Sequence, residues 1–446
     1  MKKHTNQKLH IPNPILWGIT IIILTIIEIF LLIAISKIPR SAIKNNTRES
    51  AQYFMQRDVF YNISESDTAS RVDHYADAIL INIIYNYDDN APLSSTLKAA
   101  YYHSDNYNEN DNLLTAVSCN VAPTYEYSRY WHGSAILIRP LLTILNIKQI
   151  YNLFALLLIA LTIVVLIILY RNGYKACMIS FLIALIAISP WYIPMSLEYI
   201  WCFLIMLISI LIILYIYNQY SIVTPIFFLI IGNVTAYFDF LTTETLTLLA
   251  PLSILLIVMY EKNKLENFKE GMKVIISHSL AWGTGYISSW IIKWTISSIV
   301  LHKNIFSEAL SSASSRIYGN AGNMTGIKLS VHALIRNISC LLPFNFIQKY
   351  SYVYAILSFL VILMIYYLFR KIKNKNFITG LFAIIYCIPY IRYITLANHS
   401  FVHYFFTYRA QFASVFCLCI IFYYGIDKKL VSKILPFISG SHNPSR

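Results

Sequence analysis

The stretch that decides the fold is ILWGITIIILTIIEIFLLIAI, which runs from Ile15 to Ile35. A helix of this length is long enough to cross the ~30 Å hydrocarbon core of a bilayer. The run is too long for the apolar core of a signal peptide, and no small-residue cleavage site follows it. Because Lys2, Lys3 and Lys8 precede the run, we expect the N-terminus to stay in the cytoplasm.

Similar apolar runs recur along the chain, which is 57% hydrophobic and only 13% charged. An average soluble domain is about 25% charged, so the composition excludes a soluble enzyme, and the solid runs exclude a porin-type barrel of alternating strands. The pattern predicts an all-α, polytopic transmembrane protein of about ten spans. The further spans are expected at 149–170, 176–194, 198–217, 223–238, 244–260, 274–300, 350–370, 377–395 and 404–425.

These runs divide the chain into membrane and loop segments. The expected segments are a cytoplasmic N-terminus (1–14), a first transmembrane helix (15–36), a large extracytoplasmic loop of amphipathic helices (37–148), transmembrane helices two to seven (149–300), a second extracytoplasmic loop (301–349), transmembrane helices eight to ten (350–426) and a cytoplasmic tail (427–446). Within the second loop we expect a flexible part from Ser311 to Gly326 and then a helix near 327–342.

Loop charge supports this threading. From Glu49 to His132 the chain holds 12 acidic and 4 basic residues, whereas the short loops assigned to the cytoplasm are rich in Lys and Arg. The positive-inside rule therefore places the large loop outside and both termini inside. It also assigns the net charge of +14 to cytoplasmic loops, so no nucleic-acid partner is expected.

The large loop contains Arg71-Val-Asp-His-Tyr-Ala-Asp77, in which apolar residues recur at three- and four-residue steps. The spacing predicts an amphipathic helix lying on the membrane, with Asp73 and Asp77 on one side of it. A partly desolvated carboxylate there could serve as a general base for a hydroxyl acceptor. Asp73 and Asp77 are therefore the candidate catalytic residues. The alternative is a solvated helix face.

The same loop ends in Arg129-Tyr130-Trp131-His132, which mixes aromatic and cationic side chains. Such residues stack on sugar rings, and they also form the aromatic belt of a membrane protein. The belt accounts well for Tyr130 and Trp131 but less well for Arg129 and His132. All four are candidate substrate-binding residues.

Two further outer segments carry ionisable residues at the membrane boundary, and these too are candidate substrate-binding residues. Asp239 and Glu244 lie between two spans, where the alternative to a functional role is a short polar turn. Arg392, His399, His403 and Arg409 lie in the last outer segment and the start of the last span. An unpaired Arg409 would be costly in an apolar run, so it should face a cavity, an anionic ligand, or Asp239 or Glu244 in a structural ion pair.

Histidines are enriched on the expected outer side, but only His399 and His403 have a distinctive spacing. A divalent metal is therefore not indicated, and no other cofactor is expected.

The arrangement of one span, a long outer loop with an early acidic motif, and many further spans resembles the integral-membrane glycosyltransferases of the GT-C superfamily, such as protein O-mannosyltransferases and bacterial aminoarabinose transferases. The segments Tyr127-Ser-Arg-Tyr-Trp-His-Gly133 and Asn398-His-Ser-Phe-Val-His-Tyr-Phe-Phe-Thr-Tyr-Arg409 also resemble those of a group of polytopic bacterial membrane proteins. The resemblance implies a base at Asp73 or Asp77, and basic residues that hold the donor phosphate, with Arg129, Arg336, Arg392 and Arg409 as candidates. The chain departs from the superfamily in having Asp-His in place of a paired acidic motif.

The resemblance implies a transferase in the bacterial cytoplasmic membrane. Its partners would be a polyprenyl-phosphate-linked sugar, membrane lipid, and a cell-surface glycan, lipid or protein acceptor. Two alternatives stay open: a transporter or flippase of a lipid-linked glycan, and a sensor or assembly factor whose outer loop binds a partner. A flippase predicts ionisable residues along a path through the membrane, and Lys293 and His278 are the main candidates for such a path.

Overall fold

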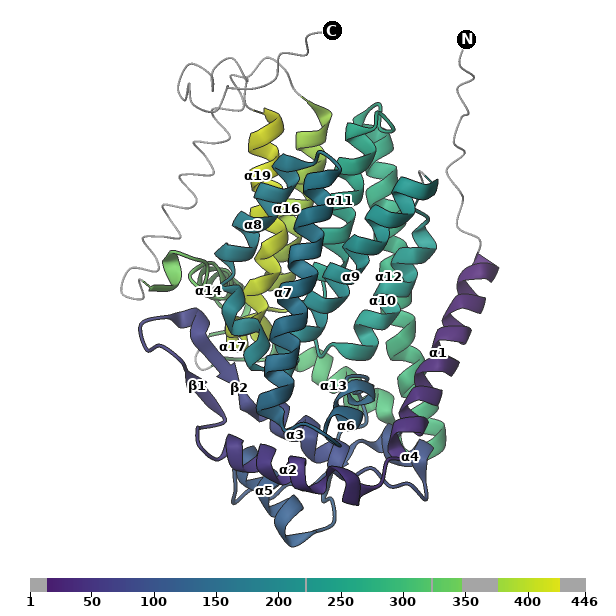
Figure 1. The fold of residues 1–446 in the computed structure, drawn as a ribbon, viewed down its shortest axis with the longest axis vertical. Helices are drawn as coiled ribbons and strands as arrows, with labels where there is room; N and C mark the ends of the chain where they lie inside the picture. The colour runs from purple at the N-terminus through teal and green to yellow at the C-terminus, as the bar shows by residue number, and fades with distance from the viewer. Residues whose placement is uncertain (1–13, 221–222, 322–323, 347–375, 426–446) are drawn as a thin grey trace.

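The computed structural model describes residues 14–220, 223–321, 324–346 and 376–425 of the chain. These residues are mostly helical (Figure 1). Long helices run side by side along the long axis, and short elements gather at one end of the bundle. The helices of the bundle are α1 (Pro14–Ser36), α7 (Ile147–Arg171), α8 (Lys175–Ala187), α9 (Leu197–Tyr220), α10 (Pro225–Phe238), α11 (Leu246–Glu261), α12 (Phe268–Leu301), α16 (Phe377–Thr395) and α19 (Phe412–Gly425).

Five segments of this bundle are long and apolar enough to cross a membrane. They are α1, α7, α9, α16 and the segment Tyr404–Gly425, in which α18 (Tyr404–Thr407), η5 (Tyr408–Gln411) and α19 follow one another. The chain is therefore a helical membrane protein, as the sequence predicts.

Ten spans are not confirmed. Helices α8, α10 and α11 coincide with expected spans but are only 13, 14 and 16 residues long, which is short for a bilayer crossing. Helix α12 has 34 residues, but Ser, Gly, Trp and Lys residues interrupt its apolar sequence. It is not one of the five segments that are long and apolar enough to cross a membrane. The span expected at 350–370 lies outside the described residues.

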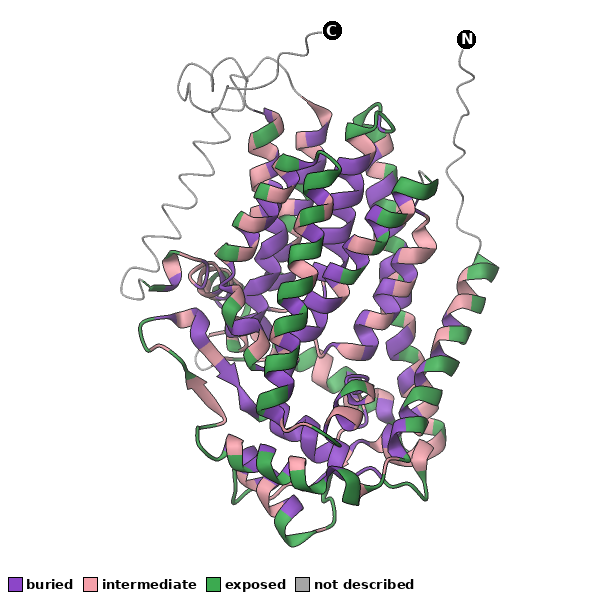
Figure 2. Ribbon diagram, viewed as in Figure 1, coloured by how far each residue is buried: buried purple, intermediate pink, exposed green. Residues whose placement is uncertain are grey.

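Burial separates the outer helices of the bundle from the central ones (Figure 2). Helices α1 and α7 expose rows of large apolar side chains, such as Ile26 and Phe30 on α1 and Leu156 and Ile159 on α7. Helix α9 and the α18–α19 segment are mostly buried. A contiguous exposed apolar surface of this kind suits contact with lipid.

Helices α10 and α12 touch backbone to backbone. A Cβ added to Gly232 would lie 2.0 Å from the carbonyl oxygen of Trp282, and one added to Gly285 would lie 2.0 Å from that of Leu229. Small residues at both contact points allow this approach, which is common between membrane helices. The large loop packs against this helix pair, because Trp131 Nε1 donates a hydrogen bond of 3.1 Å to the Ser289 carbonyl of α12.

The large loop folds into short elements at one end of the bundle (Figure 1). They are α2 (Arg40–Phe54), β1 (Phe60–Asn62), η1 (Thr68–Ser70), β2 (Arg71–Asp73), α3 (His74–Tyr85), α4 (Pro92–Lys98), β3 (Ala100–Tyr101), α5 (Glu109–Cys119), β4 (Tyr125–Glu126) and α6 (Ala135–Leu141). Strands β1 and β2 pair antiparallel, as do β3 and β4, so the fold is not purely helical.

The expected amphipathic helix around Asp73 is wrong in two respects. Residues 71–73 form strand β2, and α3 begins only at His74, because Asp73 adopts an extended conformation and caps the helix. Nor does α3 lie on the membrane with one polar face, since nearly all its residues are buried. It is surrounded by α2, α5, α6 and α9. Helix α2, in contrast, buries Ile43, Thr47 and Ala51 on one face and exposes the other, as expected for an amphipathic helix.

The second loop is more ordered than its Ser-rich sequence indicates. Helix α13 (Ile305–Tyr318) covers the first part of the stretch expected to be flexible, and the side chain of Asn304 caps it. Helix α14 (Gly326–Ile338) corresponds to the helix expected near 327–342. The remaining short elements are η2 (Pro190–Met195), η3 (Phe344–Phe346) and α17 (Ala397–Val402).

Charge divides the two ends of the bundle. The acidic loop with α2 to α6 lies at one end, whereas the α7–α8 and α11–α12 connections, which carry Arg171, Lys175, Lys262 and Lys264, lie at the other (Figure 1). The acidic loop and the basic connections, which the sequence predicts on opposite sides of the membrane, therefore lie at opposite ends of the bundle.

Candidate functional site

Asp73 is held at the junction between the large loop and the bundle. It ends strand β2 and caps α3, where its Oδ1 accepts a hydrogen bond of 2.8 Å from the backbone N–H of Ala76. The residue is only 3% exposed. A strand and a helix start thus fix this carboxylate in the interior, where it can act on a bound group without competition from bulk water.

Glu198 is the partner of Asp73. It lies in the first turn of α9, and the two carboxyl groups share a hydrogen bond. Such a bond requires that one of the two carboxyl groups be protonated. Glu198 Oε2 has no hydrogen-bond partner among the described residues. The sequence gives no sign that Glu198 meets Asp73.

The environment of Asp73 suits a general base. Burial raises the pKa of this carboxyl to about 6, although the hydrogen bonds from Ala76 and Glu198 and the charge of Arg71 oppose the increase. A base with a pKa just below neutral pH is ionised in solution at pH 7 and still accepts a proton readily.

Asp77, the other candidate base, has a different position. Its carboxylate accepts hydrogen bonds from the backbone N–H groups of Leu197 (2.8 Å) and Glu198 (3.3 Å), from the Ser196 hydroxyl (3.2 Å) and from the Tyr151 hydroxyl. Asp77 therefore caps α9 from the large loop, and burial raises its pKa to about 7. Since these donors all belong to α7 and to the start of α9, Asp77 acts on the fold, and Asp73 stays the candidate base.

Arg409 is the least satisfied charged group in the described part of the chain. It is fully buried in η5, and none of its three side-chain nitrogens has a hydrogen-bond partner there. Its guanidinium carbon lies 4.3 Å from the centre of the Tyr199 ring and 5.1 Å from that of Tyr408. Tyr199 is in turn within electrostatic reach of Asp73 and Glu198. Five unused N–H donors in the interior are suited to an anionic ligand.

Neither Asp239 nor Glu244 forms the ion pair considered for Arg409. Glu244 instead pairs with Arg392, whose Nε and Nη2 donate to the two carboxylate oxygens at 2.7 and 3.0 Å. Arg392 Nη2 also donates to the carbonyl of Leu241 at 2.8 Å. This bidentate pair ties the α10–α11 connection to α16 and leaves Arg392 little capacity for a ligand.

Asp239 follows the last residue of α10 and is buried in the bundle. It accepts hydrogen bonds from the backbone N–H of Thr242 at 3.0 Å and from the Thr242 hydroxyl. Burial and then the charge of Glu244 raise its pKa to about 6. Asp239 lies within electrostatic reach of Glu198, so the structure brings it near the Asp73–Glu198 pair.

The rings of His399 and His403 contact each other in a tilted arrangement, with ring centres 4.7 Å apart. Burial, followed by nearby cations, lowers the pKa of both rings, that of His403 to about 4, so both are neutral at pH 7. His399 Nε2 contacts the Leu241 carbonyl at 2.8 Å, and the Nδ1 atoms of both rings have no partner in the described residues. Arg316 of α13 contributes to this cationic surrounding and was not anticipated from the sequence.

The Arg129–His132 segment is packed into the protein. Arg129 forms a 2.8 Å ion pair with Glu308 of α13, and Arg316 donates to the Tyr130 hydroxyl. Tyr130 is 2% and Trp131 is 1% exposed. The aromatic rings thus pack against α12 rather than forming a lipid-facing belt, and they present no open face for a sugar. His132 contacts the Tyr127 carbonyl at 3.1 Å.

Arg336 lies apart from the acidic pair, on α14. It donates to the Phe401 carbonyl at 3.1 Å and lies 3.8 Å from the centre of the Tyr404 ring. In the described residues no three or more His, Cys, Asp and Glu side chains are grouped to hold a metal ion. The site that emerges is acidic at Asp73, Glu198 and Asp239, and cationic at Arg409.

Comparison of the chain with protein-family models, with curated proteins and with solved structures found no match.

Proposed function

We propose that this protein is a membrane glycosyltransferase that moves a sugar from a polyprenyl-phosphate-linked donor to an acceptor on the outer face of the membrane. The observation that supports this most is the buried Asp73–Glu198 pair close to Tyr199, whose ring also contacts the guanidinium of Arg409. That guanidinium has no hydrogen-bond partner among the described residues. A base and an anion-binding group are the two elements that such a transfer requires.

Asp73 acts as the base in this proposal. The acceptor hydroxyl gives its proton to the Asp73 carboxylate, and its oxygen forms a bond to the anomeric carbon of the sugar. The bond between that carbon and the donor phosphate oxygen breaks, and the electron pair leaves with the phosphate. The products are the glycosylated acceptor and the polyprenyl phosphate anion.

Arg409 stabilises the charge that develops on the leaving phosphate. Its guanidinium is fully buried, so its interaction with an anion is screened little by water. Because its donors have no partners in the described residues, no existing bond must break before it binds phosphate. Glu198 holds the proton shared with Asp73 and keeps that carboxylate oriented, while Asp239 helps to orient donor or acceptor.

The proposed location is the cytoplasmic membrane of a bacterium, with both termini in the cytoplasm. The site lies near the end of the bundle at which the acidic loop folds. The basic connections between α7 and α8 and between α11 and α12 lie at the opposite end. Under the positive-inside rule this arrangement supports a site on the outer side. The likeness to GT-C glycosyltransferases noted from the sequence suggests the same side.

The test is turnover by the purified protein in nanodiscs with a panel of polyprenyl-phosphate sugars. Release of free polyprenyl phosphate, even by slow transfer to water, is the expected result. Absence of release from every sugar in the panel, with and without a bacterial envelope extract as acceptor source, would contradict the proposal.

A second candidate, a flippase for a lipid-linked glycan, is favoured by one observation. Glu28 lies in the middle of α1, is only 5% exposed, and has no hydrogen-bond partner for either carboxylate oxygen in the described residues. A buried ionisable group within a span is a typical feature of transport paths. Movement of a labelled lipid-linked sugar across proteoliposomes, without sugar transfer and with loss of movement in Glu28→Gln, would favour this candidate.

A further inference from the structure

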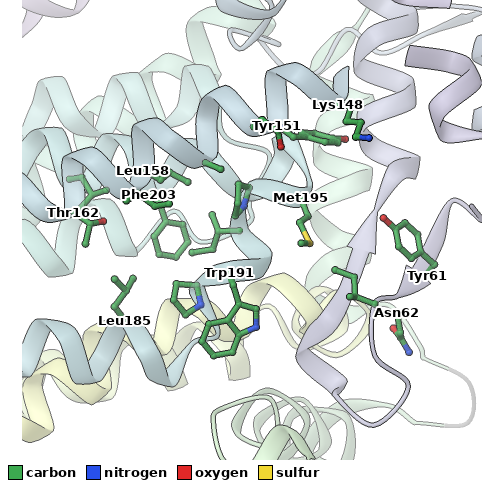
Figure 3. Close-up of a pocket in the computed structure, with 18 of the residues that line it drawn as sticks. Tyr61, Asn62, Lys148, Tyr151, Leu158, Thr162, Leu185, Trp191, Met195 and Phe203 are labelled. Carbon is green, nitrogen blue, oxygen red and sulfur yellow. The ribbon is translucent and has the colours of Figure 1, made fainter. Parts of the chain in front are cut away.

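A large cavity opens on the side of the bundle between α7, η2 and α9 (Figure 3). Its volume is about 980 Å³, within the upper range of ligand sites. Helix α2 and strand β1 of the large loop close one end of it. None of the residues assigned to the candidate site lines this cavity.

Most of the cavity is apolar. Leu158 and Ile159 of α7, Phe203 and Leu207 of α9 and Leu185 of α8 line it, and Ile159 is more than half exposed. This part of the cavity runs along α7 and α9, which are both long and apolar enough to cross a membrane. A hydrocarbon chain is the ligand that such a surface fits, since it can enter from the bilayer.

The end of the cavity near the large loop is cationic. Arg57 and Lys148 line it together with Tyr61 and Asn62, and Figure 3 shows Lys148, Tyr61 and Asn62 at the end away from Thr162 and Leu185. Neither Arg57 nor Lys148 forms an ion pair or a side-chain hydrogen bond within the described part of the chain. The Arg57 guanidinium carbon lies 5.8 Å from the centre of the Tyr61 ring, so this cation contacts an aromatic face. Two cations without an ion pair among the described residues, at the end of an apolar groove, suit a lipid with a phosphate head.

A polar pocket of about 470 Å³ continues from this cationic end and shares Gln56, Arg57, Tyr61 and Asn62 with the groove. Its other walls include Asp58, Asn108 and Asp111, together with Asn110. Asn110 is 1% exposed, and its Oδ1 has no partner among the described residues. Amide and carboxylate groups of this kind accept hydrogen bonds from a hydroxyl-rich head group.

We propose that this groove binds the acceptor of the transfer and that the acceptor is itself a lipid, with a long chain, a phosphate and a hydroxyl-rich head. The chain lies along α7 and α9, the phosphate contacts Arg57 and Lys148, and the head occupies the polar pocket. The inference that the groove binds a lipid depends only on the cavity and its lining residues. The inference that this lipid is the acceptor rests on the proposed function.

The position of the groove relative to Asp73 supports an acceptor. Tyr61 lines the groove and lies 5.0 Å, ring centre to ring centre, from His74, the neighbour of Asp73. Tyr151 lines it as well and donates to Asp77. Tyr61 and Tyr151 therefore connect the groove to the start of α3, where Asp73 caps the helix. Strand β1, which carries Tyr61, pairs with the strand that ends at Asp73.

The cationic end of the groove, with Arg57 and Lys148, and the buried Arg409 differ in the kind of phosphate charge that they can bind. Arg57 is exposed and Lys148 lies at the same open edge, so they match a permanent phosphate charge that stays solvated. Arg409 is fully buried, where it matches a charge that develops during reaction. We therefore assign the donor phosphate to Arg409 and the acceptor phosphate to Arg57 and Lys148.

The test measures binding of undecaprenyl diphosphate N-acetylglucosamine, as a probe, to the full chain in phosphatidylcholine nanodiscs. The variant Arg57→Ala/Lys148→Ala should weaken binding by roughly 100-fold, because two charge-assisted contacts are lost. Arg48→Ala is the matched control, since Arg48 is an exposed cation on α2, outside the cavity, and this variant should bind like the wild type.

Two results would overturn the lipid site: equal binding by the double variant and the wild type, or equal competition by phosphatidylglycerol, which would make the groove a general phospholipid site. A filling variant, Thr162→Trp, addresses the apolar part separately and should also weaken binding without removing a charge. Transfer of labelled sugar from donor to the probe class by the wild type supports the acceptor role. If wild-type protein binds the probe but releases no polyprenyl phosphate from any donor, the proposed function fails and the lipid site remains.

Discussion

The carboxyl group of Asp73, at the end of strand β2, shares a hydrogen bond with the carboxyl group of Glu198, in the first turn of α9. The contact joins the large loop to a central helix of the bundle. Asp77 reinforces the junction, because it accepts hydrogen bonds from the first N–H groups of the same helix. The position of Asp73 thus depends on Glu198 at the start of α9. The start of α9 in turn depends on Asp77 of the large loop.

Asp73→Asn is expected to remove sugar transfer while leaving the fold intact. Asparagine keeps the side-chain oxygen that caps α3 but cannot take a proton from a hydroxyl. Loss of a general base lowers the rate about 100- to 10,000-fold. The measurement is release of polyprenyl phosphate, with donor binding as the control for folding. Turnover at the wild-type rate would remove Asp73 from the mechanism.

Asp77→Asn provides the matched comparison, and its expected effect is on stability. The amide retains one acceptor oxygen, so some of the four hydrogen bonds to the carboxylate are lost. A buried donor left unsatisfied costs about 1–3 kcal/mol. The midpoint of thermal unfolding should fall, and the turnover of the protein that remains folded should change only a few-fold. A loss of turnover equal to that of Asp73→Asn would show that the assignment of the two residues is wrong.

The pH dependence of transfer should show an acid limb near pH 6. Asp73 has a pKa of about 6, and only its ionised form accepts a proton, so kcat/KM should fall as the pH is lowered through this value and stay level above it. Because the hydrogen bond from Glu198 lowers the pKa of Asp73, Glu198→Ala should move the limb to higher pH. Glu198→Gln keeps a donor and should move it less. A limb that stays fixed in Glu198→Ala would exclude Asp73 as the titrating group.

The helices of the bundle could be predicted from the sequence because hydropathy and capping act locally. The run expected at 149–170 corresponds to α7, whose start is fixed by the capping box of Asn146 and Gln149. The number of spans could not be predicted equally well. Whether a short apolar helix such as α10 crosses the bilayer depends on its packing against neighbours, which the run of apolar residues does not specify.

The site could be predicted only in part. Asp73, Asp239 and Arg409 stand out because charge is rare at the membrane boundary. The Asp73–Glu198 pair and the bond between Arg316 and Tyr130 are contacts between distant segments, and no local pattern indicates them. The spacing of Asp73 and Asp77 suggests one shared helix face, yet α3 begins after Asp73 and gives the two carboxylates separate roles.

Arg409→Met and Arg392→Met should have opposite effects on stability. Arg409 has no hydrogen-bond partner in the described residues, so replacing it removes the cost of burying an unpaired charge, and the unfolding temperature should rise. Arg392→Met leaves the buried Glu244 unpaired, which costs about 3–5 kcal/mol. Transfer should fall about 100-fold or more in Arg409→Met, because a group that stabilises the leaving phosphate is lost. An Arg409→Met variant that is less stable than the wild type and transfers sugar normally would make Arg409 a structural residue.

The contact between α10 and α12 predicts that two glycines two residues apart on α12 respond differently to the same substitution. A Cβ at Gly285 would lie 2.0 Å from the Leu229 carbonyl oxygen, whereas one at Gly283 has nothing within 4 Å. Gly285→Ala must push the helices apart and should cost about 1–3 kcal/mol, because overpacking forces a backbone shift. Gly283→Ala adds a better helix former at an open position and should stabilise by about 0.5–1 kcal/mol. Thermal unfolding of both variants in the same detergent checks the pair, and equal midpoints would show that the two helices do not touch at Gly285.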